Sequence, residues 1–293
     1  MTTIAVLGLG QMGRPIARNL CVAGFAVRAW NRSEVTLDPM VPRAATIADA
    51  VSGADVIITM LADDAATEAV VFAERGVLAQ AASGALHMAM STISLAIVDR
   101  MTAAHAERGQ RFVAAPVFGR PDAAAAAQLW IVPGGTEADL AAVAPVFAAL
   151  GRGTWPMPGP REAMLAKLLG NFLLAGTAEL FAEAFTVGEK GGLTPESLLA
   201  LYTGTLFGSP AVQRYGGSVA STVFEPAGFP LRLGLKDVGL ALEAARSLEA
   251  PLPIGNLLCD HMTTAMARGR GHIDWAGLAT VVRENAGLAP TRR

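Results

Sequence analysis

Lys167 and Asn171 lie four residues apart inside a long apolar stretch of the chain. On a helix, residues at this spacing share one face. An ammonium group there could stabilise the negative charge that develops on a carbonyl oxygen during reduction, and could donate a proton to it. The amide of Asn171 could orient the substrate or the lysine. Both are therefore candidate catalytic residues. The alternatives are a surface lysine whose stem covers apolar neighbours and an amide bonded to a neighbouring helix.

A second candidate site is the glycine-rich turn over residues 8–13, between an apolar run and a helical pattern. Its glycines have the G-x-G-x-x-G spacing of dinucleotide-binding turns. The first glycine permits a tight turn, the second lets backbone approach a pyrophosphate, and the third lets helix pack on strand. The helix N-terminus then offers N–H groups to phosphate oxygens. A tight turn without a ligand is the alternative. The predicted cofactor contacts are Gly8, Leu9, Gly10, Gln11, Met12 and Gly13.

The residues after the second predicted strand indicate which cofactor this turn would hold. A carboxylate at that position would bind the ribose 2′-hydroxyl of NAD. The chain has Asn31, Arg32 and Ser33 there instead. Arg32 can pair with a 2′-phosphate, and Asn31 and Ser33 can hydrogen-bond to the same phosphate. We therefore predict that NADP(H) is preferred over NAD(H), although Glu34 follows directly. A solvated loop arginine beside a turn asparagine is the alternative.

Short apolar runs alternate with helical patterns over the first half of the chain, which predicts βαβ units and a parallel sheet. The strands are almost continuously apolar, as in a sheet that is covered on both faces. We also expect Leu61 and Ala62, which follow one of these strands, to contact the cofactor. The expected strands are residues 4–7, 26–30, 55–60, 86–90 and 111–115, and the expected helices are 14–23 and 47–51.

The pattern changes near residue 153, where a segment rich in glycine and proline cannot continue a helix. No convincing strand follows it. We therefore expect an α/β domain over residues 1–160 and an all-α domain over 161–293, joined by a long helix. Gly208, Gly216 and Gly217 suggest a mobile stretch between residues 204 and 217. The expected helices are 163–190, one that begins at Pro195 with Thr194 as its N-cap, 235–248, 254–268 and 275–285.

The composition argues against several classes of partner. The net charge is -2 and the pI is about 6.1, so we expect neither nucleic-acid binding nor a charged membrane-surface patch. The apolar stretch 164–187 contains four polar residues that a bilayer would bury, so we expect a core helix and no membrane span. The N-terminus lacks the basic segment of a signal peptide. Cys21 and Cys259 have no metal-ligand spacing, and we expect no metal, no disulfide and a cytoplasmic location.

Taken together, these motifs resemble those of the β-hydroxyacid dehydrogenase superfamily, which includes 3-hydroxyisobutyrate dehydrogenases and is related to imine reductases. The resemblance covers nearly the whole chain. The motifs that carry it are the turn 8–13, Ser91-Thr92-Ile93, the segment 114–120, the Lys-x-x-x-Asn of 167–171, and Leu235-Lys236-Asp237.

The resemblance implies a Rossmann-type N-terminal domain, an all-α C-terminal domain and a homodimer with closely packed helical domains. It also implies active sites between the domains that act on a small molecule. It assigns Ser91 and Thr92 to the substrate or the nicotinamide ribose, and Lys236 to the cofactor. The alternatives are a Ser/Thr cap on the helix that starts near Leu95 and an ion pair between Lys236 and Asp237.

The substrate loop departs from the family pattern. Phe118 stands where the family has a carboxylate-binding serine, and Arg120 replaces the second glycine after it, leaving Gly119 in place. A phenylalanine ring cannot donate a hydrogen bond, whereas Arg120 could clamp a carboxylate in two places or point to solvent. These changes leave the hydride chemistry intact but put the substrate class in question.

Three functions fit the sequence. The first is an NADP(H)-dependent oxidoreductase of a small semialdehyde or keto acid, with Lys167 as proton donor and acceptor. The second is an NADPH-dependent imine reductase on the same scaffold, which the loss of the carboxylate-binding serine favours and the lysine disfavours. The third is a module that senses the cofactor without turnover, and retention of Lys167 and Asn171 speaks against it.

Overall fold

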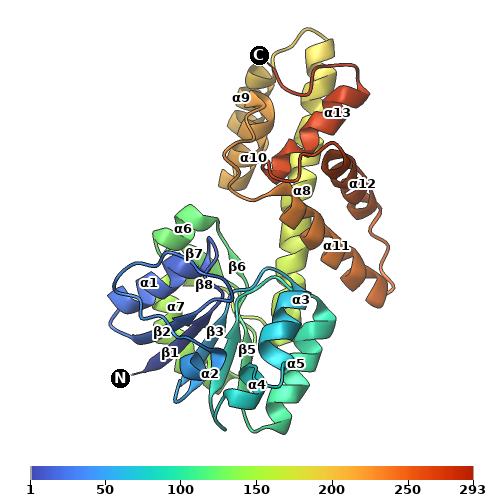
Figure 1. Ribbon diagram of the computed structural model, residues 1–293. Coiled ribbons are helices and arrows are strands. Elements are labelled where there is room, and N and C mark those ends of the chain that lie inside the picture. The colour runs from blue at the N-terminus through green and yellow to red at the C-terminus, as the bar shows by residue number, and fades with distance from the viewer. Residues whose placement is uncertain (1, 293) are drawn as a thin grey trace. The chain divides into compact units, whose positions relative to one another are not determined.

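The computed structural model describes residues 2–292, which form two compact units with the boundary after Lys167 (Figure 1). The first unit contains a five-stranded parallel sheet in the order β2-β1-β3-β4-β5. The predicted fold class, an α/β Rossmann-type domain followed by an all-α region, is confirmed. The strands are β1 (Thr3–Leu7), β2 (Ala26–Trp30), β3 (Val56–Thr59), β4 (Leu86–Ala89) and β5 (Arg111–Ala114).

Helices cover both faces of this sheet, which explains why its strands are apolar on both sides (Figure 1). Alternate strand residues such as Ile4, Val6 and Ile58 pack with Ile16 and Leu20 of α1 in one fully buried core. On that side lie α1 (Gly13–Val22), α6 (Pro121–Ala125) and α7 (Glu137–Leu150). The remaining helical segments are α2 (Ile47–Val51), α3 (Asp64–Thr67), the π-helix η1 (Glu68–Phe72), α4 (Val77–Gln80) and α5 (Leu95–Glu107).

A three-stranded sheet, which sequence patterns did not predict, completes the first unit. Its members are β6 (Val117–Phe118), β7 (Leu129–Ile131) and β8 (Gly151–Thr154). The first two are too short to show a period of two, and β8 has glycine at alternate positions. Gly153 leaves room for the indole of Trp130, because a Cβ there would lie 2.4 Å from the ring. Pairing across the sheet therefore forms these strands in spite of their weak local propensity.

The second unit is all-α, as predicted. Its helices are the later part of α8 (Pro160–Lys190), α9 (Pro195–Thr205), α10 (Pro210–Ser221), α11 (Leu231–Ser247), α12 (Pro253–Ala267), the 3₁₀ segment η2 (Trp275–Leu278) and α13 (Ala279–Asn285). The helix expected over 275–285 is divided between η2 and α13. Gly216 and Gly217, which suggested a mobile stretch, lie within α10, so only residues 206–209 connect α9 to α10.

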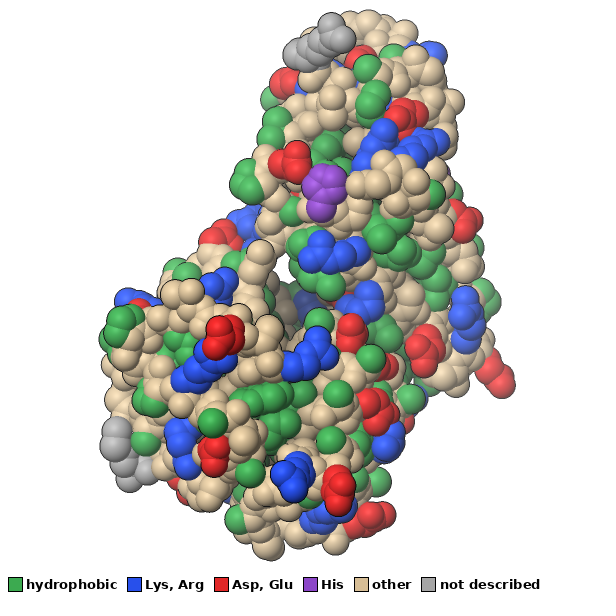
Figure 2. All heavy atoms as spheres, in the orientation of Figure 1, with side chains coloured by type: hydrophobic (Ala, Val, Ile, Leu, Met, Phe, Trp, Pro, Cys, Tyr) green, Lys and Arg blue, Asp and Glu red, His purple; other side chains and the backbone are tan. Residues whose placement is uncertain are grey.

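Among the described residues, α8 is the one helix whose length and mean hydropathy of 1.3 would allow a membrane span. Half of its most apolar window is buried inside the structure, and core helices meet the same criteria. On the face shown in Figure 2, basic and acidic side chains are intermingled. That distribution agrees with the near-equal totals of 23 basic and 25 acidic residues.

A chain of buried hydrogen bonds links β3 and β4 to α5 and to the residue before β5. Thr59 Oγ1 lies 2.9 Å from His87 Nε2, and His87 Nδ1 lies 2.8 Å from His105 Nε2. His105 Nδ1 lies 2.8 Å from Gln110 Oε1. The amide nitrogen of Gln110 donates to the carbonyl oxygens of Leu78 and Ala81, which fixes the orientation of that side chain.

This orientation determines the direction of every bond in the chain. Gln110 Oε1 must accept, so His105 carries its proton on Nδ1 and accepts at Nε2. His87 therefore donates from Nδ1 and accepts from the Thr59 hydroxyl. Both imidazoles are neutral. Burial lowers the pKa of His105 to about 4, and burial together with neighbouring His105 holds the pKa of His87 well below its usual value.

We expect the first unit to lose stability as the pH falls from 7 to 5. In the unfolded chain each histidine takes up a proton near pH 6.5, whereas the folded unit resists this until about pH 4 for His105. The stabilisation is therefore complete above pH 6.5 and is lost as the pH falls toward 4. His105 alone should cost about 2 kcal/mol of unfolding free energy between pH 7 and pH 5.

Urea titrations followed by the amide signals of β4 and β5 would measure this loss. The double variant His87→Leu/His105→Phe should flatten the dependence on pH, whatever its stability at pH 7. His272→Asn is the control, because the His272 side chain is 64% exposed and lies outside this buried network. An equal slope in the parent and the double variant would contradict the assignment.

Candidate active site

The glycine turn follows β1 at the point where the sheet order reverses, with β2 on one side of β1 and β3 on the other. Open α/β sheets bind ligands at such a point. Gly8 has φ +97°, and a Cβ at Gly13 would lie 1.8 Å from the carbonyl oxygen of Gly8. The turn and the close packing of α1 on β1 therefore explain these two glycines.

Gly10 has no such explanation within the chain. A Cβ there would meet no atom within 4 Å, so the protein itself leaves the space beside this backbone open. Helix α1 has no side-chain N-cap and no acidic residue in its first turn. Open space over Gly10 and an uncapped helix N-terminus together fit an anionic pyrophosphate. Gln11 is exposed and Met12 is half-buried beside this space, whereas the side chain of Leu9 is buried.

The Asn31-Arg32-Ser33 segment follows β2 at the same end of the sheet. The side-chain oxygen of Asn31 accepts the N–H of Leu9 at 2.9 Å, and its amide nitrogen donates to the backbone and hydroxyl oxygens of Ser33. Asn31 therefore holds the glycine turn against β2. The side chains of Arg32 and Ser33 are exposed, so they are free of packing roles in the core.

The loops after β3 and β4 are joined by Ser91. Its buried hydroxyl accepts the N–H of Leu61 at 2.7 Å and lies 3.4 Å from the carbonyl oxygen of Thr59. The helix cap considered as the alternative role is made by Ser94, whose hydroxyl accepts the N–H of Ile97. Ala62 is exposed and Thr92 is half-buried beside this junction.

Lys167 and Phe118 are in direct contact within the first unit. Lys167 Nζ lies 4.3 Å from the centroid of the Phe118 ring, in cation–π geometry. The Lys167 side chain is buried, with 7% of the residue exposed. Phe118 is half-buried in β6, Gly119 after it is exposed, and Arg120 is half-buried at the start of α6. Lys167 is therefore not the surface lysine considered as its alternative.

Asn171 is one turn further along α8, and its amide nitrogen donates to Asp237 Oδ2 of α11 at 2.6 Å. Lys236 Nζ lies 2.9 Å from Asp237 Oδ1. The alternative contacts considered for Asn171 and Lys236 are therefore both present, and Asp237 joins them. From the sequence, Asp237 was considered only as an ion-pair partner of Lys236. In the structure it is 2% exposed and also accepts the bond from Asn171.

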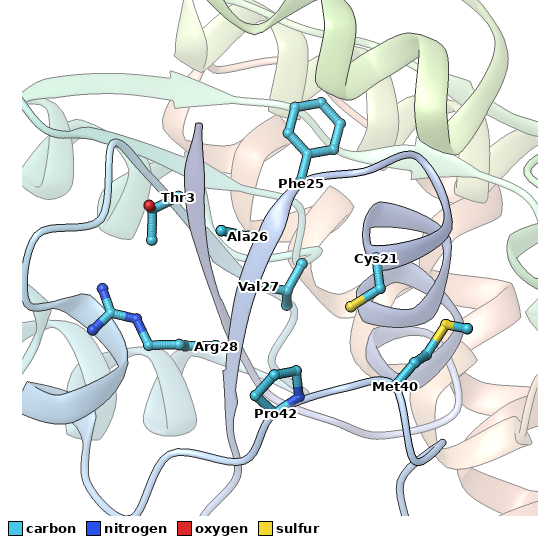
Figure 3. A pocket seen from close by; sticks show the side chains of 8 residues that line it. All are labelled: Thr3, Cys21, Phe25, Ala26, Val27, Arg28, Met40 and Pro42. Atoms are coloured by element: carbon cyan, nitrogen blue, oxygen red, sulfur yellow. The ribbon is translucent and has the colours of Figure 1, made fainter. Parts of the chain in front are cut away.

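A cavity of about 420 Å³ lies elsewhere in the first unit, beside the outer edge of β2 (Figure 3). It is at the end of β1 and β2 opposite to the glycine turn, and none of the predicted site residues lines it. Its lining residues are Thr3, Cys21, Phe25, Ala26, Val27, Arg28, Met40 and Pro42. Over residues 2–292, no group of three or more His, Cys, Asp or Glu side chains could hold a metal ion.

Two family models match the chain. Residues 3–160 match the NAD-binding domain of 6-phosphogluconate dehydrogenase, and residues 162–282 match the NAD-binding domain of NADP-dependent 3-hydroxyisobutyrate dehydrogenase. An uncharacterized oxidoreductase of Bacillus subtilis is 42% identical over 96% of this chain and 99% of its own. The NAD-dependent L-serine dehydrogenase of Pseudomonas aeruginosa is 32% identical, over 94% of this chain and 96% of its own.

Solved structures agree with these matches. The 3-hydroxyisobutyrate dehydrogenase of Mycobacterium tuberculosis, solved with L-serine, has a TM-score of 0.86 and 32% identity, covering 97% of this chain and 99% of its own. An imine reductase of Myxococcus stipitatus, with a TM-score of 0.63 and 18% identity over 96% and 99% of the two chains, shares the fold. The chain therefore belongs to the β-hydroxyacid dehydrogenase superfamily of oxidoreductases, and its N-terminal domain is of the type that binds a pyridine nucleotide.

Proposed function

We propose that this protein is an NADP(H)-dependent oxidoreductase that interconverts a small semialdehyde or keto acid and its hydroxy acid, with Lys167 as proton donor and acceptor. The observation that carries the proposal is the burial of Lys167, which is 7% exposed. Lys167 is one of three lysines in the chain, and lysine is almost never fully buried unless it is paired. In an oxidoreductase, such a group is well suited to a reaction that moves a proton with a hydride.

When bound, the cofactor supplies or accepts the hydride at the carbonyl carbon. Lys167 would stabilise the negative charge that develops on the carbonyl oxygen and donate a proton to it. In the reverse direction the neutral amine would take that proton back. Asn171 is held by Asp237, so its amide is fixed in position to orient the substrate or Lys167. Ser91 and Thr92, together with the loop of Phe118, Gly119 and Arg120, would then bind the rest of the substrate.

The cofactor would lie over the glycine turn, with its pyrophosphate beside Gly10 and the N-terminus of α1. Asn31 holds this turn, and Arg32 and Ser33 are exposed where an adenosine 2′-phosphate could reach them. Leu61, Ala62 and Lys236 complete the proposed cofactor contacts. The L-serine dehydrogenase relative is NAD-dependent, whereas the family model that matches residues 162–282 is named for an NADP-dependent enzyme. The preference for NADP(H) therefore rests on Arg32 and on the absence of a carboxylate among residues 31–33.

We further propose residues 1–160 as the cofactor-binding domain and 161–293 as the helical substrate and dimerisation domain of a cytoplasmic homodimer without nucleic-acid or membrane partners. Leu173, Leu180 and Val187 of α8 support the dimer. They recur every seven residues and are 64%, 66% and 73% exposed in the single chain. An apolar stripe with this repeat is typical of a helix that packs against another helix.

A second function, reduction of an imine, is favoured by Phe118 alone. The ring occupies the position of a serine hydroxyl that binds the substrate carboxylate in the family pattern. A substrate without a carboxylate would not need that hydroxyl. Both functions use the same cofactor, so the choice between them depends on the substrate.

Replacement of Lys167 by alanine should lower kcat about 10²–10⁴-fold, because the variant loses its proton donor, while the Kd for NADPH stays the same. NADPH consumption would be measured with small semialdehydes and keto acids, and separately with neutral ketones and cyclic imines. Lys190→Ala is the matched control, because Lys190 ends the same helix and donates to the carbonyl oxygen of Ala286. Turnover that is confined to imines or neutral ketones would overturn the proposed substrate class, and unchanged turnover in Lys167→Ala would overturn the role of Lys167.

Replacement of Arg32 by alanine should weaken NADPH binding at least about tenfold and leave NADH binding nearly unchanged. The reason is the loss of a charged hydrogen-bond donor to the 2′-phosphate, which only NADPH carries. Calorimetric titration with each cofactor would give the ratio of the two Kd values. Arg108→Ala is the control, since Arg108 is exposed after α5 at the opposite end of the sheet. An unchanged ratio in Arg32→Ala would show that the assignment is wrong.

A further inference from the structure

The contact between Phe118 and Lys167 depends on structure within the first unit alone. Phe118 is fixed in β6, which pairs with β7 in the register Phe118–Trp130. The start of α8 is fixed separately, by a bridge between Gly134 and Met157 and by the ion pair of Arg161 with Asp99 of α5. Both residues of the contact are therefore held by structure of the first unit.

The face of the Phe118 ring attracts the Lys167 ammonium electrostatically, which differs from the hydrogen bond that a serine hydroxyl would make. The face of an aromatic ring carries partial negative charge and attracts an ammonium group within about 6 Å, more strongly when the pair is desolvated. The observed 4.3 Å is well inside this range, and Lys167 is buried. The long lysine side chain is flexible, and contact with the ring restricts its motion.

We propose that Phe118 is a positioning residue that holds the ammonium of Lys167 against its ring face, in place of the hydrogen-bonding serine of the family pattern. The inference rests on the proposed function only for its effect on turnover, because the contact itself can be measured in the resting protein. Phe118 makes no bond to a reacting atom in this role. It fixes the direction from which Lys167 approaches the substrate oxygen.

Lysine-selective ¹³C labelling of the whole protein tests the contact without any substrate. The chain has only three lysines, Lys167, Lys190 and Lys236, so three Cε signals are expected. The Hε protons of Lys167 should be shifted upfield by the ring current of Phe118, and that shift should vanish in Phe118→Leu and persist in Phe118→Tyr. The signals of Lys190 and Lys236 are internal controls. A Lys167 signal that is not shifted in the parent would overturn the proposal.

Steady-state kinetics test the consequence of the contact. Phe118→Leu, which keeps an apolar side chain but has no ring, should lower kcat roughly tenfold with the cofactor Kd unchanged, and Phe118→Tyr should restore it. Trp130→Leu is the matched control, because Trp130 pairs with Phe118 across the sheet while its ring contacts Arg152 instead. Equal kcat values in Phe118→Leu and Phe118→Tyr would overturn the positioning role.

The two measurements separate this inference from the proposed function. An upfield Lys167 signal that depends on Phe118, in a protein without turnover of any carbonyl or imine, would leave the contact standing and reject the function. Turnover that depends on Lys167, with no shifted signal, would keep the function and reject the role of Phe118.

Discussion

Burial of Lys167 is the constraint on which the rest of the proposed site depends. Removal of a charged group from water is costly unless neighbouring groups compensate. In this chain part of the compensation comes from the ring of Phe118. The small sheet places that ring, and the anchored first turns of α8 place the lysine. A site of this kind needs rigid elements behind it, because a misplaced proton donor loses most of its effect on the rate.

The polar network of the first unit gives the cofactor side of the site similar support. Thr59 ends β3, and its hydroxyl begins the buried chain through His87, His105 and Gln110. Its carbonyl oxygen accepts the N–H of Met90 at 2.9 Å and lies near the hydroxyl of Ser91. Ser91 in turn holds Leu61. The neutral histidines thus stabilise the same strand ends from which the proposed cofactor loops emerge.

Much of the fold could be predicted from the sequence, because local patterns determine it. The strands of the parallel sheet are short apolar runs, and Gly8 and Gly13 are required by the turn that follows the first of them. The β6–β8 sheet could not be predicted in this way, since Gly151 and Gly153 give β8 no apolar face and only long-range pairing makes it a strand. In the site, too, local spacing could be predicted from the sequence and long-range contacts could not. The Lys167–Asn171 spacing is visible in the sequence, whereas the bond from Asn171 to Asp237 and the contact of Lys167 with Phe118 join residues that are far apart in the chain.

Transfer of deuterium from [4,4-²H₂]NADPH to a substrate would show directly whether the protein catalyses hydride transfer, because both hydrogens at C4 of this cofactor are labelled. In single-turnover reactions with the parent protein and a small semialdehyde or keto acid, we expect one deuterium on the former carbonyl carbon of the product, with the hydroxyl proton drawn from Lys167 and solvent. NADPH binding at the glycine turn with no deuterium in any reduced product would show that the protein does not transfer hydride to these substrates.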